Sequence, residues 1–137
     1  MAANSRLAVA AHIVSVLAFK RDEFVPSHSI ASSVNTHPTV IRRILAALTR
    51  AGIVASEEGK SGGSKLMKCP SKITLLDLSF AVGEDHLFAV HKNPTNESCP
   101  ISRTMKKALG KVFSDAEKAA FIQLQRVSIA DLAIEVG

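Results

Sequence analysis

The first twenty residues carry apolar side chains at steps of three and four positions, which is the spacing of one face of an α-helix. The pattern predicts a helix over residues 6–19, with Ser5 available as its N-cap. A polar run at residues 20–23 is expected to end this helix. The apolar positions are Leu7, Ala10, Ile13, Val14 and Leu17.

Residues 27–44 have the spacing of a helix-turn-helix, a pair of helices joined by a tight turn. Asn35 falls where the turn needs a left-handed backbone, which Asn tolerates better than most residues other than Gly. Pro38 falls at the first position of the second helix, where its missing amide costs nothing. A generic helical hairpin is the alternative interpretation. The residues expected to pack inward are Ile30, Val34, Ile41 and Ile44.

Two stripes are predicted along the second helix of this pair. The stripe expected to be buried consists of Val40, Ile41, Ile44, Ala47, Leu48 and Ala51. The stripe expected to be exposed is small, polar and cationic, and consists of Thr39, Arg42, Arg43 and Ala46. Small residues permit close approach to a major groove, and Arg binds guanine edges or phosphates. The exposed stripe is therefore a candidate DNA-reading face, with an ordinary solvated helix face as the alternative.

A two-stranded hairpin is predicted after this helix. Gly52 is expected as the helix C-cap, residues 53–56 as one strand and residues 64–68 as the other. The glycine-rich turn EGKSGGSK between them does not match a phosphate-binding loop, because position 54 is Val where that loop requires Gly. The hairpin instead predicts a wing whose Lys60 and Lys65 contact DNA phosphates. A mobile surface loop is the alternative.

The C-terminal half is predicted to be helical. A capping box at residues 74–77 opens a helix, residues 83–100 form a long connection, and helical spacing resumes at Ile101. A second capping box at residues 114–117 predicts a further helical stretch to about Val127, and a third at residues 128–131 predicts a last short turn. The fold class is mainly α with a small β-hairpin. We expect a winged helix-turn-helix DNA-binding domain at 1–82, a connecting loop at 83–100 and a helical dimerisation region at 101–137.

Composition and charge favour binding of a polyanion over catalysis. The chain has 137 residues and 47% hydrophobic content, enough for one domain with its own core. Residues 1–80 carry ten Lys and Arg against five Asp and Glu, whereas residues 81–137 carry seven of each. Trp and Tyr are absent from the sequence, which disfavours stacking on single-stranded nucleic acid. A basic first part joined to a neutral, alanine-rich helical part predicts a DNA-binding module with an assembly module.

The two cysteines exclude a disulfide framework or a four-cysteine zinc site within one chain. With so few cysteines, a protein of the reducing cytoplasm without a membrane partner is expected. The alternative is an export signal in the apolar N-terminal run, which His12 and Ser15 interrupt and which is too short to span a bilayer. Cys99 is a candidate redox sensor, with an ordinary loop cysteine as the alternative, and Cys69 is expected to be a packing residue. No nucleophile, base and orienting residue stand at recognisable spacing, so we expect no enzyme activity.

The chain resembles the Rrf-type winged helix-turn-helix transcription regulators, which include IscR, NsrR and CymR, and within them the YwnA-like members in particular. The resemblance rests on these segments: NSRLAVAAHIVSVLA at 4–18, VNTHPTVIRRILAALTRAGIV at 34–54, GKSGGSKL in the wing, ITLLDLSFAV at 73–82, and LFAVHKNP with NESCP within 87–100. It implies a dimeric repressor or activator whose long C-terminal helix crosses to its partner. Many members hold an iron–sulfur cluster through three cysteines in the connection, where this chain has only Cys99. The wing also differs from the family pattern, because this chain has Ser64 where other members commonly have an aromatic residue after the glycine pair.

The combined hypothesis is a dimeric, sequence-specific regulator that binds double-stranded DNA at a palindromic operator. We expect no cofactor, no metal and no iron–sulfur cluster. The residues expected to contact bases or phosphates are Thr36, His37, Thr39, Arg42, Arg43, Lys60 and Lys65. The alternative is a protein–protein interaction module that uses the helix pair for assembly without binding DNA. The operator sequence, the effector and the direction of regulation stay open.

Overall fold

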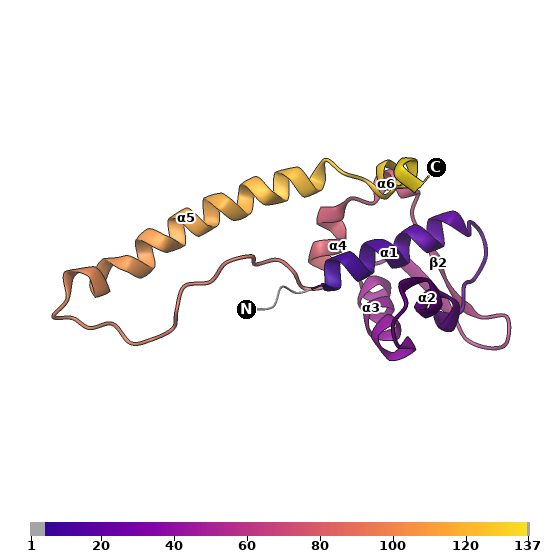
Figure 1. Cartoon of the computed structure of the whole chain (residues 1–137), viewed down its shortest axis with the longest axis horizontal. Coiled ribbons are helices and arrows are strands. Elements are labelled where there is room, and N and C mark those ends of the chain that lie inside the picture. Colours follow the sequence, from indigo (N-terminus) through magenta and orange to yellow (C-terminus); the bar gives the residue numbers. More distant parts are fainter. Residues whose placement is uncertain (1–4, 137) are drawn as a thin grey trace.

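The computed structural model describes residues 5–136, and it places a small winged-helix body at one end of a long helix (Figure 1). The body contains α1 (Arg6–Phe19), α2 (Ser27–Val34), α3 (Pro38–Arg50), β1 (Val54–Glu57), β2 (Gly63–Leu66), a 3-10 turn (Pro70–Lys72) and α4 (Leu75–Ala81). The long helix is α5 (Pro100–Gln125), and a short α6 (Ile129–Val136) follows it. The predicted class, mainly helical with one hairpin, is confirmed.

The helix-turn-helix is formed by α2 and α3, with the turn chemistry that the sequence predicted. Asn35 takes the left-handed conformation, at φ 63° and ψ 51°. Pro38 occupies the first turn of α3, and His37 precedes it as the N-cap. The Nδ1 atom of His37 accepts a hydrogen bond from the Thr39 amide at 3.1 Å, which satisfies one of the amides that a helix start leaves without a partner.

The end of α3 leads directly into the wing through a left-handed glycine. Gly52 has φ +76°, and the amide of Ile53 donates to the Leu48 carbonyl at 3.0 Å. The C-cap is Ala51, one residue before the predicted C-cap Gly52. Gly52 therefore occupies the position after the cap, where a Schellman motif requires a left-handed backbone. The strands pair antiparallel in the register Val54↔Leu66 to Glu57↔Gly63, which confirms the predicted hairpin.

A third segment fixes the wing to the body. Val25 and Ser64 exchange two backbone hydrogen bonds of 2.9 Å, so the segment before α2 runs beside β2. Gly63 lies so close to this segment that an added Cβ would stand 2.4 Å from the Val25 carbonyl carbon. The wing is therefore held at its base as well as by its own two strands.

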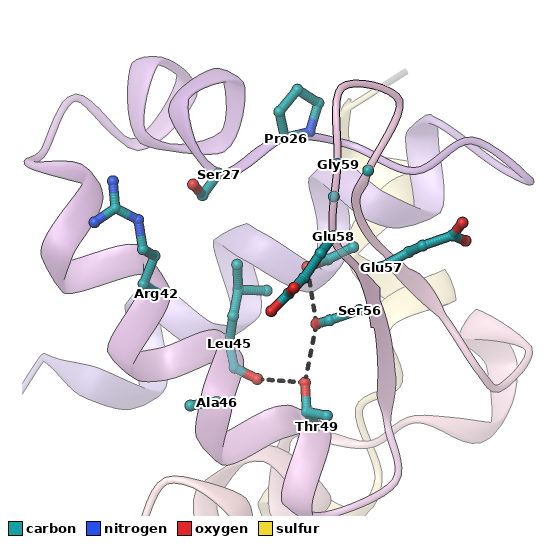
Figure 2. Close-up of a pocket in the computed structure, with 13 residues that line it drawn as sticks. Pro26, Ser27, Arg42, Leu45, Ala46, Thr49, Ser56, Glu57, Glu58 and Gly59 are labelled. Atoms are coloured by element: carbon teal, nitrogen blue, oxygen red, sulfur yellow. Dashed lines mark hydrogen bonds between the residues drawn. The ribbon is translucent and has the colours of Figure 1, made fainter.

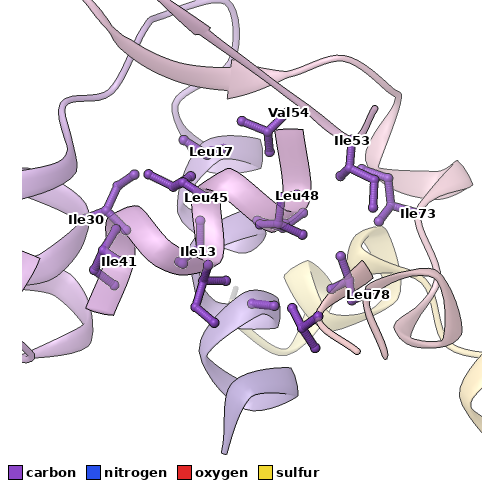
Figure 3. Packing of buried hydrophobic residues seen from close by; sticks show 14 of the residues in the cluster. Ile13, Leu17, Ile30, Ile41, Leu45, Leu48, Ile53, Val54, Ile73 and Leu78 are labelled. Atoms are coloured by element: carbon purple, nitrogen blue, oxygen red, sulfur yellow. The ribbon is translucent and has the colours of Figure 1, made fainter. Parts of the chain in front are cut away.

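The core lies between α1, α3, α4 and the base of the wing, and it is aliphatic throughout (Figure 3). On α3 it takes Ile41, Ile44, Leu45 and Leu48. The predicted stripe was wrong at three positions: Val40 is 38% exposed, Ala51 is exposed, and Leu45 is buried. Positions at i, i+3, i+4 and i+7 already span the face that α1 and α2 cover, and Ala51 lies beyond the last turn.

The C-terminal part differs from prediction in one respect. Residues 100–125 form a single continuous helix, so the expected new helix start at Ser114 was wrong. The predicted cap at residues 128–131 is confirmed, because the Ser128 amide donates to Asp131 at 2.8 Å and the Asp131 amide donates to the Ser128 hydroxyl at 3.1 Å. The helix that follows packs on α1, and its Ile129 belongs to the core of the winged-helix body.

Candidate nucleic-acid interface

The exposed face of α3 carries the residues that the sequence singled out. Thr39, Arg42, Arg43 and Ala46 are all exposed, and this helix rests on the core by its opposite side. His37 is exposed at the helix start and Thr36 is half-buried in the turn. Because Nδ1 of His37 accepts the cap hydrogen bond, the neutral ring carries its proton on Nε2. That leaves His37 one donor for an external acceptor such as a base edge or a phosphate oxygen.

The neighbouring arginines Arg42 and Arg43 of α3 line different hollows. Arg42 lines a groove of about 620 Å³ between α3 and the wing, together with Ala46 and Thr49 (Figure 2). Arg43 lines a smaller hollow of about 270 Å³ together with Arg6 and Arg50. Adjacent helical residues are about 100° apart around the axis, since a turn holds 3.6 residues. The sequence stripe that grouped Arg42 with Arg43 therefore spans two flanks of the helix.

A chain of hydroxyl groups connects α3 with the wing across the larger groove. Thr49 donates from its hydroxyl to the Leu45 carbonyl at 2.8 Å, and its Oγ1 lies 3.4 Å from Ser56 Oγ (Figure 2). Ser56 Oγ is in turn 3.4 Å from Ser64 Oγ. Ser64 is buried, so this position supports the wing from beneath. An external contact through the side chain at position 64 is excluded by that burial.

The wing itself is electrically mixed. Lys60 is exposed at its tip, whereas Lys65 is half-buried with its ammonium 4.9 Å from the centre of the Phe24 ring. That cation–π contact keeps Lys65 along the strand. Glu57 and Glu58, which are not among the predicted site residues, are exposed and line the groove beside Arg42. Carboxylates in this place repel phosphates but accept from the amino group of cytosine, so the groove is suited to base contacts more than to backbone contacts.

Comparison with known proteins agrees with this geometry. The profile of the Rrf2 family, described as an iron-dependent transcriptional regulator, matches residues 3–135. The chain belongs to the Rrf2 family. It is similar to a Bacillus subtilis (strain 168) protein named as the HTH-type transcriptional regulator YwnA, with 42% identity over 94% of this chain and 95% of that protein.

Two solved structures extend the comparison of this Rrf2 protein. A crystal structure described as a DNA binding protein has a TM-score of 0.76 at 35% identity, covering 93% of this chain and 98% of that one. A transcriptional regulator from Lactobacillus plantarum has a TM-score of 0.85 at 24% identity, covering 96% and 89%, and shows the shared fold. The chain is thus a transcriptional regulator with a winged-helix DNA-binding fold, and its relatives are regulators and not enzymes.

The cysteines of this Rrf2 protein lie apart from α3. Cys99 is half-buried and forms the N-cap of α5, where its carbonyl accepts from the Arg103 amide at 3.1 Å. Cys69 is exposed, so its predicted packing role was wrong. The Ser71 side chain and amide lower the pKa of the Cys69 thiol, and the charges of Arg21 and Lys72 act in the same direction.

The donor set does not fit an iron–sulfur cluster. Such a cluster is held by several thiolates, and the connection contributes Cys99 alone. The nearby histidines are otherwise engaged: His91 accepts from the Asn93 amide at 3.3 Å, and His86 lies 3.7 Å from the Glu117 carboxylate. Within residues 5–136, no three side chains of His, Cys, Asp or Glu are arranged to hold a metal ion. In the same part of the chain, no helix is both long and apolar enough to cross a membrane.

Proposed function

We propose that this Rrf2 protein is a homodimeric, sequence-specific regulator that binds a palindromic operator in duplex DNA and carries no iron–sulfur cluster. The observation that carries the proposal is α5, which is described over its whole length and has no buried residue among its 26. A helix that packed only within its own chain would bury one face. In this proposal residues 1–82 bind DNA, residues 83–100 connect, and the 101–137 region dimerises through α5.

Three side chains of α5 contact their own chain without becoming buried. The Phe113 ring stacks on Phe88 of the connection at 5.3 Å between ring centres, and the Phe121 ring meets Phe80 of α4 at 5.5 Å. Glu117 accepts a hydrogen bond from the Leu87 amide at 2.5 Å. These contacts fix the rotation of α5 about its own axis. The side of α5 that makes none of them is therefore available to a partner.

That surface is an apolar seam along the full length of α5. Its members recur at steps of three and four residues and are exposed: Ile101, Met105, Ala108, Val112, Ala116, Ala119 and Ile122. Such a repeat is the pattern by which two helices pack along each other, and the alanines allow a close approach. Ile101, Val112 and Ile122 are each more than half exposed. Contact of apolar side chains with water is unfavourable, and a second copy of the seam would remove that contact.

Dimerisation places two copies of α3 on one face of the assembly. Recognition helices related by a two-fold axis read half-sites about 34 to 36 Å apart, one turn of DNA, which is why the operator is expected to be palindromic. Thr36, His37, Thr39 and Arg42 contact bases or the adjacent phosphates, and Lys60 at the wing tip contacts the backbone. Arg43 and Lys65 make backbone contacts at the edges of this surface.

Cys99 is the position at which a thiol signal would act. It begins α5, so oxidation of its sulfur would change the first turn of the dimerisation helix. Mass spectrometry after mild peroxide tests this point directly, and an unmodified Cys99 removes it from the proposal without affecting DNA binding.

The experiment that tests the proposed function is selection of bound duplexes from a random pool, with and without reductant. We expect enrichment of an inverted repeat with half-site centres one turn apart. Failure to retard any duplex would favour the alternative, a protein–protein module that uses the helix pair for assembly. Enrichment of a single half-site would contradict the dimer and retain the DNA-binding role.

A further inference from the structure

Three arginines from two helices surround the smaller hollow beside α3. Arg43 and Arg50 lie seven positions apart, and therefore on the same side of α3 two turns from each other. Arg6 begins α1 and lines the hollow from across it. The rest of the lining is small or aliphatic, including Ala47 and Gly83. Arg6 and Arg50 are not among the predicted site residues, because they come together with Arg43 only in the folded chain.

The hollow brings three positive charges together. Glu84 lies against one of them, with its Oε1 3.6 Å from Arg6 Nε. The Glu84 side chain is 14% exposed, and Oε1 has no hydrogen-bond partner among the described residues. Guanidinium groups stay protonated at every physiological pH. The Glu84 carboxylate therefore balances part of the positive charge that Arg6, Arg43 and Arg50 bring to the hollow.

We infer that this hollow seats a phosphate group of the DNA backbone, on the flank of α3 that faces away from the wing. Guanidinium groups bind phosphate oxygens through paired hydrogen bonds, so three of them around one hollow suit that group. The inference rests on the proposed DNA-binding function and adds a second anchor to it.

The position of the hollow favours the DNA backbone over a free anion. A major groove is bordered by a phosphate strand on each side, and a helix lying in it has one strand along each flank. The wing with Lys60 lies on one flank of α3, and the three arginines lie on the other. Two anchors on opposite flanks would hold α3 at a fixed depth and rotation, which is what base reading by Arg42 and Thr39 requires.

The test compares Arg50→Gln and Arg6→Gln with Arg126→Gln, which removes an exposed arginine at the C-cap of α5, outside the lining of the hollow, and gives the same change of charge. Affinity for the selected operator and for a scrambled duplex is measured from 50 to 200 mM salt. Each lost phosphate contact reduces the slope of log K against log salt by about 0.9, so the loss of affinity over this range becomes about 3.5-fold smaller. We expect this change for Arg50→Gln and Arg6→Gln, equally on both duplexes, and an unchanged slope for Arg126→Gln. Circular dichroism melts verify that each variant is folded.

A second readout separates the two sources of phosphate. Thermal unfolding is recorded in inorganic phosphate and in chloride at equal ionic strength, without DNA. If Arg50→Gln abolishes stabilisation by phosphate but leaves the DNA salt slope equal to that of Arg126→Gln, the hollow binds a free anion and the inference is wrong. If both arginine variants match Arg126→Gln in every assay, the hollow binds no phosphate. If the unmodified protein retards no duplex, the proposed function fails first.

Discussion

Replacement of Val112 by Glu tests the apolar seam at its centre. Val112 is the thirteenth of the 26 residues of α5 and is 60% exposed in the single chain. Full burial of a Val side chain stabilises by about 1.5 to 3 kcal/mol, so covering the exposed part contributes about 1 to 2 kcal/mol per copy. A two-fold dimer contains the residue twice. Loss of the contact therefore costs about 2 to 4 kcal/mol per dimer, before any cost of burying a carboxylate.

This free energy corresponds to a dimer dissociation constant raised at least about 30-fold, since 1.4 kcal/mol is a factor of ten. Sedimentation equilibrium over a range of protein concentration measures that constant. Ser114→Glu is the matched control, because it introduces the same side chain at an exposed position of α5 outside the seam. Because Glu is a better helix former than Val, the thermal unfolding of the isolated chain should not suffer. Equal dissociation constants for the two variants, or a strictly monomeric unmodified protein, would refute the seam.

Other consequences follow for the wing, α3 and the exposed thiol. Gly63→Ala should lower the free energy of unfolding by about 1 to 3 kcal/mol, because the φ of +150° and the nearby Val25 backbone leave no room for a Cβ atom. Gly110→Ala should raise it by about 0.5 to 1 kcal/mol, because an added Cβ there meets no atom and Ala favours a helix. Thermal unfolding measures both changes. Arg42→Ala should weaken operator binding by about 1 to 3 kcal/mol and binding to a scrambled duplex by less, as measured by fluorescence anisotropy. Cys69 should be alkylated faster than a free thiol near neutral pH, because its lowered pKa leaves a larger fraction of the sulfur as thiolate. Ser71→Ala should slow this alkylation, as followed by mass spectrometry over time. Equal rates with and without Ser71 would contradict the assigned cause.

The winged-helix body was predictable because its turns depend on residues with few conformational options. Asn35 takes a left-handed backbone, Pro38 starts a helix, and Gly52 permits the chain to reverse after α3. Each of these residues restricts the local backbone in a way that is readable from its type alone. The structure places each of these turns and caps within one residue of its predicted position.

The errors came from patterns that local sequence cannot separate. A Ser followed three residues later by Glu caps a helix only if the chain has stopped being helical, and at Ser114 the flanking residues favour continuation of α5. The hollow that unites Arg6, Arg43 and Arg50 depends on how α1 crosses α3, which periodicity does not specify. The same is true of Cys69, whose exposure and contact with Ser71 follow from the turn before α4.

The attachment of α5 to the body links the seam to the spacing of the operator. At its C-terminal end α5 meets α4 through Phe121 and Phe80, and the chain that follows it is joined to the body by a hydrogen bond of 3.0 Å from the Leu75 amide to the Val127 carbonyl. Ile129 then enters the core. Because these contacts fix the angle between α5 and α3, the distance between the two copies of α3 in the proposed dimer depends on where the seams cross. Moving the crossing by one seam position shifts it along α5 by about 5 Å, since each residue rises 1.5 Å. A change of half-site spacing in the selected operator is therefore the expected signature of any variant that shifts the seam without breaking it.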